Sequence, residues 1–396
     1  MGPNNTQKEE PELEFILRQL RHYATLSRQT KPPAPYSSKT NWKRWWKWVQ
    51  WHRLSPIIAS QDLALAKAPT SVIEALRKAQ TANALRSLNR KREHRRILSA
   101  FQSNGIELLA IKGPALEHLY PKSAISRYAG DLDLLTRNEA IANAEKILLE
   151  LGYRKIPGDL PSFTEPHLSP KQRQFLTKHE SHLRFRHSES NLVIELHWKL
   201  SPNSHTWAIP FDLLWERRTS FPIGDQTAFT LSLEDHLMFL VLHGAFHAWF
   251  RLFWLFDIAL LLGQATPKTI ESLLNDASQH HCARALAGTL ELLRTTLQLS
   301  IPSQGNSSPE LPPDLSSYPR SLQSRFILPE RRSPIESLRH LTYRYHLLET
   351  LSAKTEGLMH FSISPLDFER MPLPDRLFPL YMALRPLFWL QRKLTR

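Results

Sequence analysis

The segment that decides the fold is "IKGPALEHLYPKSAISRYAGDLDLLT", residues 111–136. It joins a Lys-Gly-Pro turn to a short apolar run in which two aspartates, Asp131 and Asp133, stand one residue apart. Since residues i and i+2 of a strand share a face, both carboxylates should point the same way while the neighbouring leucines pack on the other side. Two such carboxylates can hold hard divalent cations. An isolated acid-x-acid pattern is a weak signal, so a polar strand edge stays the alternative.

Three neighbouring features strengthen the interpretation as a binding site. A short helix should begin after Gly113, with Pro114 at its first position, and its free N–H groups could accept a phosphate. Lys112 precedes this turn, and Arg127 lies four residues before the first aspartate, where a planar guanidinium suits phosphate oxygens. Glu195 stands in the apolar strand pattern "NLVIELHWKL", where a buried acid needs a partner or a cation. Together these residues predict a site for metal and phosphate.

The composition is that of a globular protein with a basic surface. The chain has 396 residues, of which 41% are hydrophobic and 22% charged, enough for one large domain or two. Its 51 lysines and arginines outnumber 37 acids, which gives a net charge of +14. Such a charge favours anionic partners such as nucleotides, nucleic acid or an acidic membrane surface, although a diffuse basic surface also serves solubility.

Cysteine usage and apolar runs bear on the compartment. The single cysteine, Cys282, excludes an internal disulfide and any multi-cysteine metal site, which suits a reducing compartment. The first residues are polar and acidic and do not resemble a secretory signal. The longest apolar run, residues 250–263, is too short to cross a bilayer and reads as a buried helix. We therefore expect a cytoplasmic protein without a transmembrane segment.

The predicted architecture is α/β (α+β), a small mixed sheet flanked by N- and C-terminal helical regions. Strands are expected at "IELLAI", at "DLDLLT" and in a hairpin made of "HLRFRH" and "NLVIELHWKL". Helical periodicity dominates before residue 105 and after about residue 230. The predicted regions are a tail with one helix and a Pro-rich linker (1–40), a helical region (41–104), the α/β core (105–230), a helical region (231–300), a Ser/Pro-rich linker (301–335) and a last helical region (336–396).

The segment "NWKRWWKWVQW", residues 41–51, interleaves tryptophans with basic residues. That pattern is compatible with base stacking or a membrane surface. An apolar helix face covered by lysine and arginine stems explains it equally well, and we favour this core interpretation.

Several other polar residues invite a functional interpretation. His243 and His247 have the spacing of two zinc ligands on a helix, but no glutamate follows the first, so we favour ordinary core or surface histidines. Asp257 lies in an apolar helix pattern and should be paired with Arg251, a histidine or a backbone donor; the alternative is an acceptor pocket. His197 shares a strand face with Glu195 and could line that pocket or support a ligand.

The order of these motifs resembles the bacterial uncharacterised nucleotidyltransferase family within the polymerase-beta-like nucleotidyltransferases. The matching pieces are "IKG", Tyr120, Arg127, "DLDLL", "ELHW" and "HGAFHAWFRLFWLFD". The pieces "HRLSPII" and "LPDRLFPLYMALRP" also resemble it, so that the resemblance covers about residues 42–390. Each piece is modest, but their order is fairly specific.

The resemblance implies a chemistry and a role for each matching residue. Asp131 and Asp133 would hold two Mg²⁺ or Mn²⁺ ions, and Glu195 would complete the ion on the acceptor side. An acceptor hydroxyl would attack the α-phosphorus of a nucleoside triphosphate, with ATP the expected one, as pyrophosphate leaves. Lys112, Gly113 and Arg127 would neutralise the phosphates. The acceptor could be a small molecule, a peptide or protein hydroxyl, or an RNA end.

One departure and two rivals limit this prediction. Pro114 stands where the superfamily usually has a serine or glycine, so the phosphate grip of the turn is in question. The rivals are a glycosyltransferase whose D-x-D motif holds a metal, and a non-catalytic descendant that binds a nucleotide or partner. If Glu195 lay more than about 10 Å from the aspartates, two-metal transfer would fail on geometry.

Overall fold

The structure is a computed structural model that describes residues 11–24, 40–59, 68–120, 127–128, 130–157, 159–299 and 334–394. The predicted Pro-rich linker and nearly all of the predicted Ser/Pro-rich segment fall outside these ranges. None of the described helices combines the length and the apolar character that a bilayer crossing needs.

A seven-stranded mixed sheet, ordered β3-β4-β5-β2-β1-β7-β6, forms the centre of the molecule. The strands are β1 (Leu109–Ala110), β2 (Leu132–Leu135), β3 (Tyr153–Lys155), β4 (His182–His187), β5 (Val193–His197), β6 (Thr219–Ile223) and β7 (Gln226–Thr230). The central strand β2 runs parallel to β5 and antiparallel to β1. The mixed α/β fold class predicted from the sequence is confirmed.

Two hairpins build much of this sheet, and the sequence predicted only one of them. The predicted hairpin is β4 with β5, which pair antiparallel. The other is β6 with β7, which turns at Gly224, whose φ is +68°. Pro222 lies inside β6, and a proline argues against a strand unless the strand lies at the edge of a sheet. β6 is such an edge strand, which explains why the pattern was missed.

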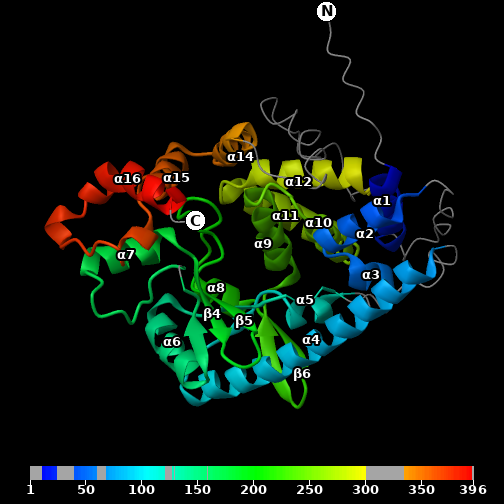
Figure 1. Cartoon of the computed structure of the whole chain (residues 1–396), viewed down its shortest axis with the longest axis horizontal. Helices are drawn as coiled ribbons and strands as arrows, with labels where there is room; N and C mark the ends of the chain where they lie inside the picture. The colour runs from blue at the N-terminus through cyan, green and yellow to red at the C-terminus, as the bar shows by residue number, and fades with distance from the viewer. Residues whose placement is uncertain are drawn as a thin grey trace, which may run out of the picture.

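The predicted helices around the site segment are present. One helix, α4 (Thr70–Ser103), runs along the lower edge of the molecule (Figure 1). The turn at Gly113 opens the short helix α5 (Pro114–Leu119), and φ of +61° at Gly113 requires a glycine there. The helix after β2 is α6 (Ile141–Glu150), preceded by a 3-10 turn at Asn138–Ala140.

A second group of helices lies above the strands in Figure 1 and to their upper right. Its members are α1 (Pro11–Ala24), α2 (Trp42–Trp51), α3 (Ser55–Ala59), α9 (Leu233–Phe246), α10 (Leu252–Leu262), α11 (Pro267–Gln279) and α12 (Ala283–Thr296). All residues of α10 are buried, as the long apolar run predicted. Trp45 and Trp48 of α2 are buried in the same core, which confirms the core interpretation of the tryptophan-rich segment.

The turn between α9 and α10 fixes how these two helices face the sheet. A Cβ at Gly244 would lie 2.1 Å from the ring of Trp249, so only glycine lets that buried indole pack against α9. Ala248 and Trp249 adopt positive φ angles of 49° and 53°, which reverses the chain. This packing orients His243 of α9 and Asp257 of α10 for the contacts described below.

The C-terminal helices are α14 (Pro334–Leu347), α15 (Leu351–Ser362) and α16 (Leu380–Leu394), which run from the top to the upper left of Figure 1. The first of them, α14, packs on α9, and its Tyr343 and Leu347 join the main core. The last, α16, packs with α7 (Pro170–His179) and the 3-10 turns Pro365–Asp367 and Asp375–Leu377 around a small separate apolar cluster that includes Phe175, Phe368 and Tyr381. The remaining helix, α8 (Phe211–Glu216), precedes the β6–β7 hairpin.

Candidate active site

The parallel pairing of β2 with β5 brings two predicted carboxylates together. Asp133 lies directly opposite Glu195, and Leu135 opposite His197. Three side chains, those of Asp133, Glu195 and His197, each offer one atom that can bind a metal, and these three atoms lie within 4.8 Å of one another. The geometric requirement set by the sequence, a glutamate close to the aspartate pair, is therefore met for Asp133.

Lys112 supplies the nearest cation. Its Nζ lies 2.7 Å from Asp133 Oδ1, and both side chains are almost completely buried. Burial alone would lower the pKa of Lys112, but Asp133, Glu195 and Asp131 outweigh it and raise that pKa. Burial would raise the pKa of Asp133, but Lys112 and His197 hold it below its usual range. Both groups are therefore charged at neutral pH.

His197 lies between the two carboxylates without bonding either. Its Nε2 is 3.7 Å from Asp133 Oδ1 and 3.6 Å from Glu195 Oε2, beyond hydrogen-bond length. Burial would lower the pKa of His197, but the two carboxylates raise it. Burial would raise the pKa of Glu195, but His197 and Lys112 lower it. The ring of His182 stacks on His197 at 4.7 Å, and burial lowers the pKa of His182 to about 4, so His182 is neutral.

This cluster fits a divalent cation. Asp133 Oδ2 and both ring nitrogens of His197 are buried and make no hydrogen bond. Polar atoms in that situation destabilise a fold unless a ligand satisfies them. Oxygen and nitrogen ligands about 2.0–2.3 Å from one ion lie up to about 4.6 Å from each other, which matches the spacing of this group.

Asp131 lies beside this group rather than in it. It immediately precedes β2, is partly exposed, and is not among the three clustered ligands. Its backbone carbonyl oxygen would be 3.6 Å from a Cβ on Gly113, so the Lys-Gly-Pro turn lies against it. Its carboxylate is close enough to raise the pKa values of Lys112 and Arg90. The sequence predicted Asp131 as the third ligand beside Asp133 and Glu195. In the structure the third member of this group is His197.

Arg127 and Asp257, predicted for phosphate and for the acceptor pocket, bind each other. Arg127 Nη2 lies 2.9 Å from Asp257 Oδ2, and the Tyr120 hydroxyl donates to Asp257 Oδ1. Burial would lower the pKa of Arg127, but Asp257 raises it. Asp257 is paired as predicted, but with Arg127 and Tyr120 rather than with Arg251, a histidine or a backbone donor. Arg251 instead stacks on the ring of Trp51 at 4.2 Å.

Arg90 of α4 is a cation that the sequence did not single out. Its side chain is 1% exposed, and none of its three guanidinium nitrogens makes a hydrogen bond. The nearest carboxylate oxygen belongs to Glu117, 3.6 Å away. Burial lowers the pKa of Arg90 to about 10, and Glu117, followed by Asp131 and Asp133, partly offsets that shift. Arg90 is thus ion-paired with Glu117 but makes no hydrogen bond, so its N–H groups can still donate to an anion.

His243 also faces the site from α9. Burial lowers its pKa well below the usual value, and Lys112, His197 and His182 contribute to the shift. Its ring lies 4.6 Å from that of His247 and 5.0 Å from that of Trp254. Within the described ranges neither histidine belongs to a group of metal ligands.

Comparison with known proteins identifies the family. A family model described as "Uncharacterised nucleotidyltransferase" matches residues 38–298. The chain belongs to this nucleotidyltransferase family. The matched segment contains the whole carboxylate cluster, whereas the C-terminal resemblance up to residue 390 lies beyond it.

Two further comparisons add little to this assignment. The chain is similar to the crystal structure of an antigenic nucleotidyltransferase-like protein from Paracoccidioides brasiliensis, with 16% identity and a TM-score of 0.28. That likeness covers 54% of this chain and 93% of the other, and is too weak to bear on the site. Curated proteins yield no match.

The contacts of Asp257 predict a structural role for it in this nucleotidyltransferase. Asp257→Asn leaves the Arg127 guanidinium buried without an anion, which should lower the free energy of unfolding by about 3–5 kcal/mol. Urea unfolding followed by circular dichroism measures the loss. The control is Asp225→Asn, whose side chain is 75% exposed beside Arg95 and should cost less than about 1 kcal/mol. Equal stability of Asp257→Asn and wild type would contradict the structural role.

Proposed function

We propose that this protein is a metal-dependent nucleotidyltransferase. It moves a nucleoside monophosphate from a nucleoside triphosphate, with ATP the first candidate, to an acceptor hydroxyl and releases pyrophosphate. The observation that carries the proposal is the pairing of Asp133 with Glu195 beside His197, with Asp133 Oδ2 buried and without a hydrogen bond. Family membership supports the class of reaction.

The residues that would hold the ions lie on two adjacent strands. Asp133, Glu195 and His197 would hold one Mg²⁺ or Mn²⁺. Asp131, which immediately precedes β2, would share a second ion with Asp133. When bound, such ions lower the pKa of an acceptor hydroxyl and neutralise charge on the phosphates. The hydroxyl oxygen bonds to the α-phosphorus, its proton passes to the carboxylate–histidine cluster, and the bond to the β-phosphate oxygen breaks.

Cationic side chains, rather than the helix end, would bind the triphosphate. The helix after Gly113 has only six residues and begins with Pro114, so it offers few free N–H groups. Lys112 lies against Asp133, and Arg90 has all its hydrogen-bond donors free. Arg127 adds positive charge but is held by Asp257, so we assign it mainly to positioning the chain before Asp131.

The rivals and the compartment can be weighed on the same observations. Family membership favours nucleotidyl transfer over a D-x-D glycosyltransferase. Lys112, Asp131, Asp133 and Glu195 are all present, which argues against a non-catalytic descendant. The buried, unpaired thiol of Cys282 is compatible with the proposed cytoplasmic location.

The proposed reaction predicts label transfer that depends on Asp133. Each α-labelled nucleoside triphosphate is incubated with magnesium, cell extract and protein, and label in the acceptor is measured. Asp133→Asn should reduce transfer about 100-fold or more, because it removes a charge that binds the ion. The surface variant Asp225→Asn should transfer label as the wild type does. Transfer that is absent with every triphosphate, or is independent of Asp133, would favour a non-catalytic descendant.

The free guanidinium of Arg90 predicts a phosphate contact. Arg90→Met keeps much of the buried apolar stem and removes the charge, so it should raise the Kd of a fluorescent triphosphate on the order of tenfold. Fluorescence anisotropy measures the affinity. The control is Lys91→Met, a neighbour on α4 whose side chain is 47% exposed, which should leave Kd within about twofold. Equal affinities of Arg90→Met and wild type would remove Arg90 from the site.

A further inference from the structure

A cavity of about 380 Å³ lies between the C-terminal helices and the rest of the chain. Phe246 of α9, His179 of α7 and the loop at Pro202 and Asn203 form one wall. Residues of α14 and α15, with Leu348 between them, form the other. Its lining is mainly apolar with a few polar groups, and its volume is within the range of small-molecule sites.

The cavity is lined by the last residue of α9, a helix whose preceding turns face the carboxylate cluster. Three residues along one face of α9 connect them, Phe239, His243 and Phe246, which are four and three residues apart. Lys112 Nζ lies over the ring of Phe239, 5.3 Å from the ring centre. His243 interacts electrostatically with His182 and His197. Phe246 lines the cavity and stands about 4.5 Å further along the helix axis than His243.

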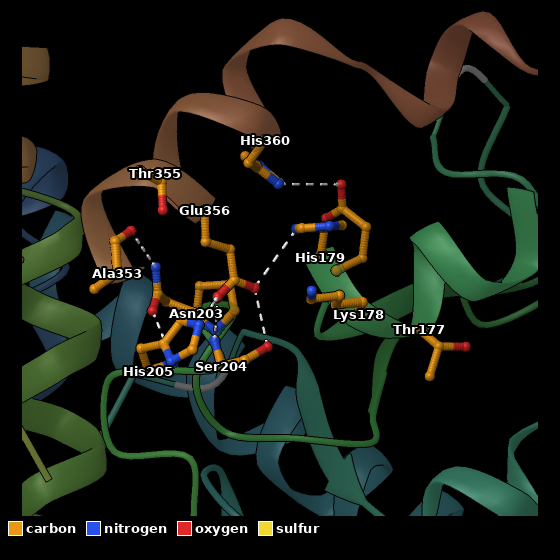
Figure 2. Close-up of polar contacts among 12 residues, drawn as sticks. Thr177, Lys178, His179, Asn203, Ser204, His205, Ala353, Thr355, Glu356 and His360 are labelled. Carbon is orange, nitrogen blue, oxygen red and sulfur yellow. Dashed lines mark hydrogen bonds and ion pairs between the residues drawn. The ribbon is translucent and has the colours of Figure 1, made fainter. Parts of the chain in front are cut away.

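The one carboxylate in the lining is already bound to protein. Figure 2 shows Glu356 of α15 reaching toward the loop of Asn203 and Ser204, with His179 nearby. Glu356 accepts hydrogen bonds from the Ser204 backbone N–H at 3.0 Å and from its hydroxyl at 2.9 Å. Glu356 Oε1 also lies 3.5 Å from His179 Nδ1. This network joins α15 to the core and uses both carboxylate oxygens of Glu356 in contacts with protein.

The positive charge in the lining is not matched. Among the described residues Arg344 of α14 makes neither a hydrogen bond nor an ion pair, and its guanidinium carbon lies 5.7 Å from the centre of the Phe246 ring. Burial lowers the pKa of His360, another lining residue, to about 4, so His360 is neutral. The cavity therefore combines apolar walls with one arginine that has no hydrogen-bond or ion-pair partner among the described residues.

We propose that this cavity binds the acceptor of the transfer reaction, a small molecule with an apolar body and an anionic group that pairs with Arg344. The assignment of this ligand as the acceptor rests on the proposed nucleotidyl transfer. The class of ligand that the cavity binds does not depend on it. The anion lies at Arg344, the apolar body packs on Phe246 and the leucines, and the acceptor hydroxyl points along α9 toward Glu195.

A pair of dyes tests the ligand class. 8-Anilinonaphthalene-1-sulfonate has an apolar body and one anionic group, and N-phenyl-1-naphthylamine is its uncharged parent. Fluorescence titration of the full-length protein should give tighter binding of the sulfonate. Arg344→Met should raise the Kd of the sulfonate on the order of tenfold and leave the Kd of the uncharged parent unchanged. Thr342 is an exposed residue of the cavity lining, and Thr342→Trp should weaken the binding of both dyes because the indole fills part of the cavity.

The control is Arg339→Met, an exposed arginine on the same helix that does not line the cavity and should change neither affinity. Unfolding curves establish that each variant is folded. Equal sulfonate binding by Arg344→Met and wild type, or full binding of both dyes by Thr342→Trp, would overturn the proposal.

The acceptor role is tested in the label-transfer assay with the ultrafiltrate of a cell extract. Thr342→Trp should lose most of the transfer while its affinity for the fluorescent triphosphate is unchanged. The acceptor role would be overturned if the wild type transferred label only with the whole extract and not with its ultrafiltrate. Full transfer by Thr342→Trp would overturn it as well. Absence of transfer in the wild type with normal dye binding would instead count against the proposed function.

Discussion

The buried ion pair of Lys112 with Asp133 is the constraint on which the site depends. A carboxylate at the centre of a sheet is tolerated only if it is paired, and the lysine reaches it because the turn at Gly113 lies against the start of β2. The register of β2 with β5 then adds Glu195 directly opposite Asp133 and His197 two residue pairs further along. One lysine cannot satisfy this group, since Asp133 Oδ2 stays without a hydrogen bond. This buried oxygen without a partner is the physical reason to expect a cation site between β2 and β5.

The surrounding elements divide the site into two sides. On one side α4 contributes Arg90, and the buried pair of Arg127 with Asp257 ties the segment before Asp131 to α10. These charges favour a polyanion. On the other side α9 leads from the cluster to a mainly apolar cavity, and most of the residues that line this cavity lie beyond the segment that matches the family model. Helices that precede and follow the sheet thus surround a cluster of Asp133, Glu195 and His197 that comes from β2 and β5.

The sequence predicted what depends on local pattern. The strand with Asp133, the turn at Gly113 and the hairpin with Glu195 each have a short signature and were found. Long-range pairing was not predictable: Asp257 bonds Arg127, 130 residues away, rather than Arg251 nearby. Arg90 stands among basic residues in "NRKREHRR", where no spacing distinguishes the one buried arginine from its exposed neighbours.

The central claim is that the β2–β5 pair holds a divalent cation at which a triphosphate reacts. Crystals grown with Mn²⁺ and a non-hydrolysable triphosphate analogue, measured near the manganese absorption edge, test it directly. The account predicts an anomalous peak within about 2.3 Å of Asp133, Glu195 and His197 donor atoms, with the α-phosphate beside it. Saturating Mn²⁺ with no peak at these residues, or a triphosphate bound on another surface, would contradict it.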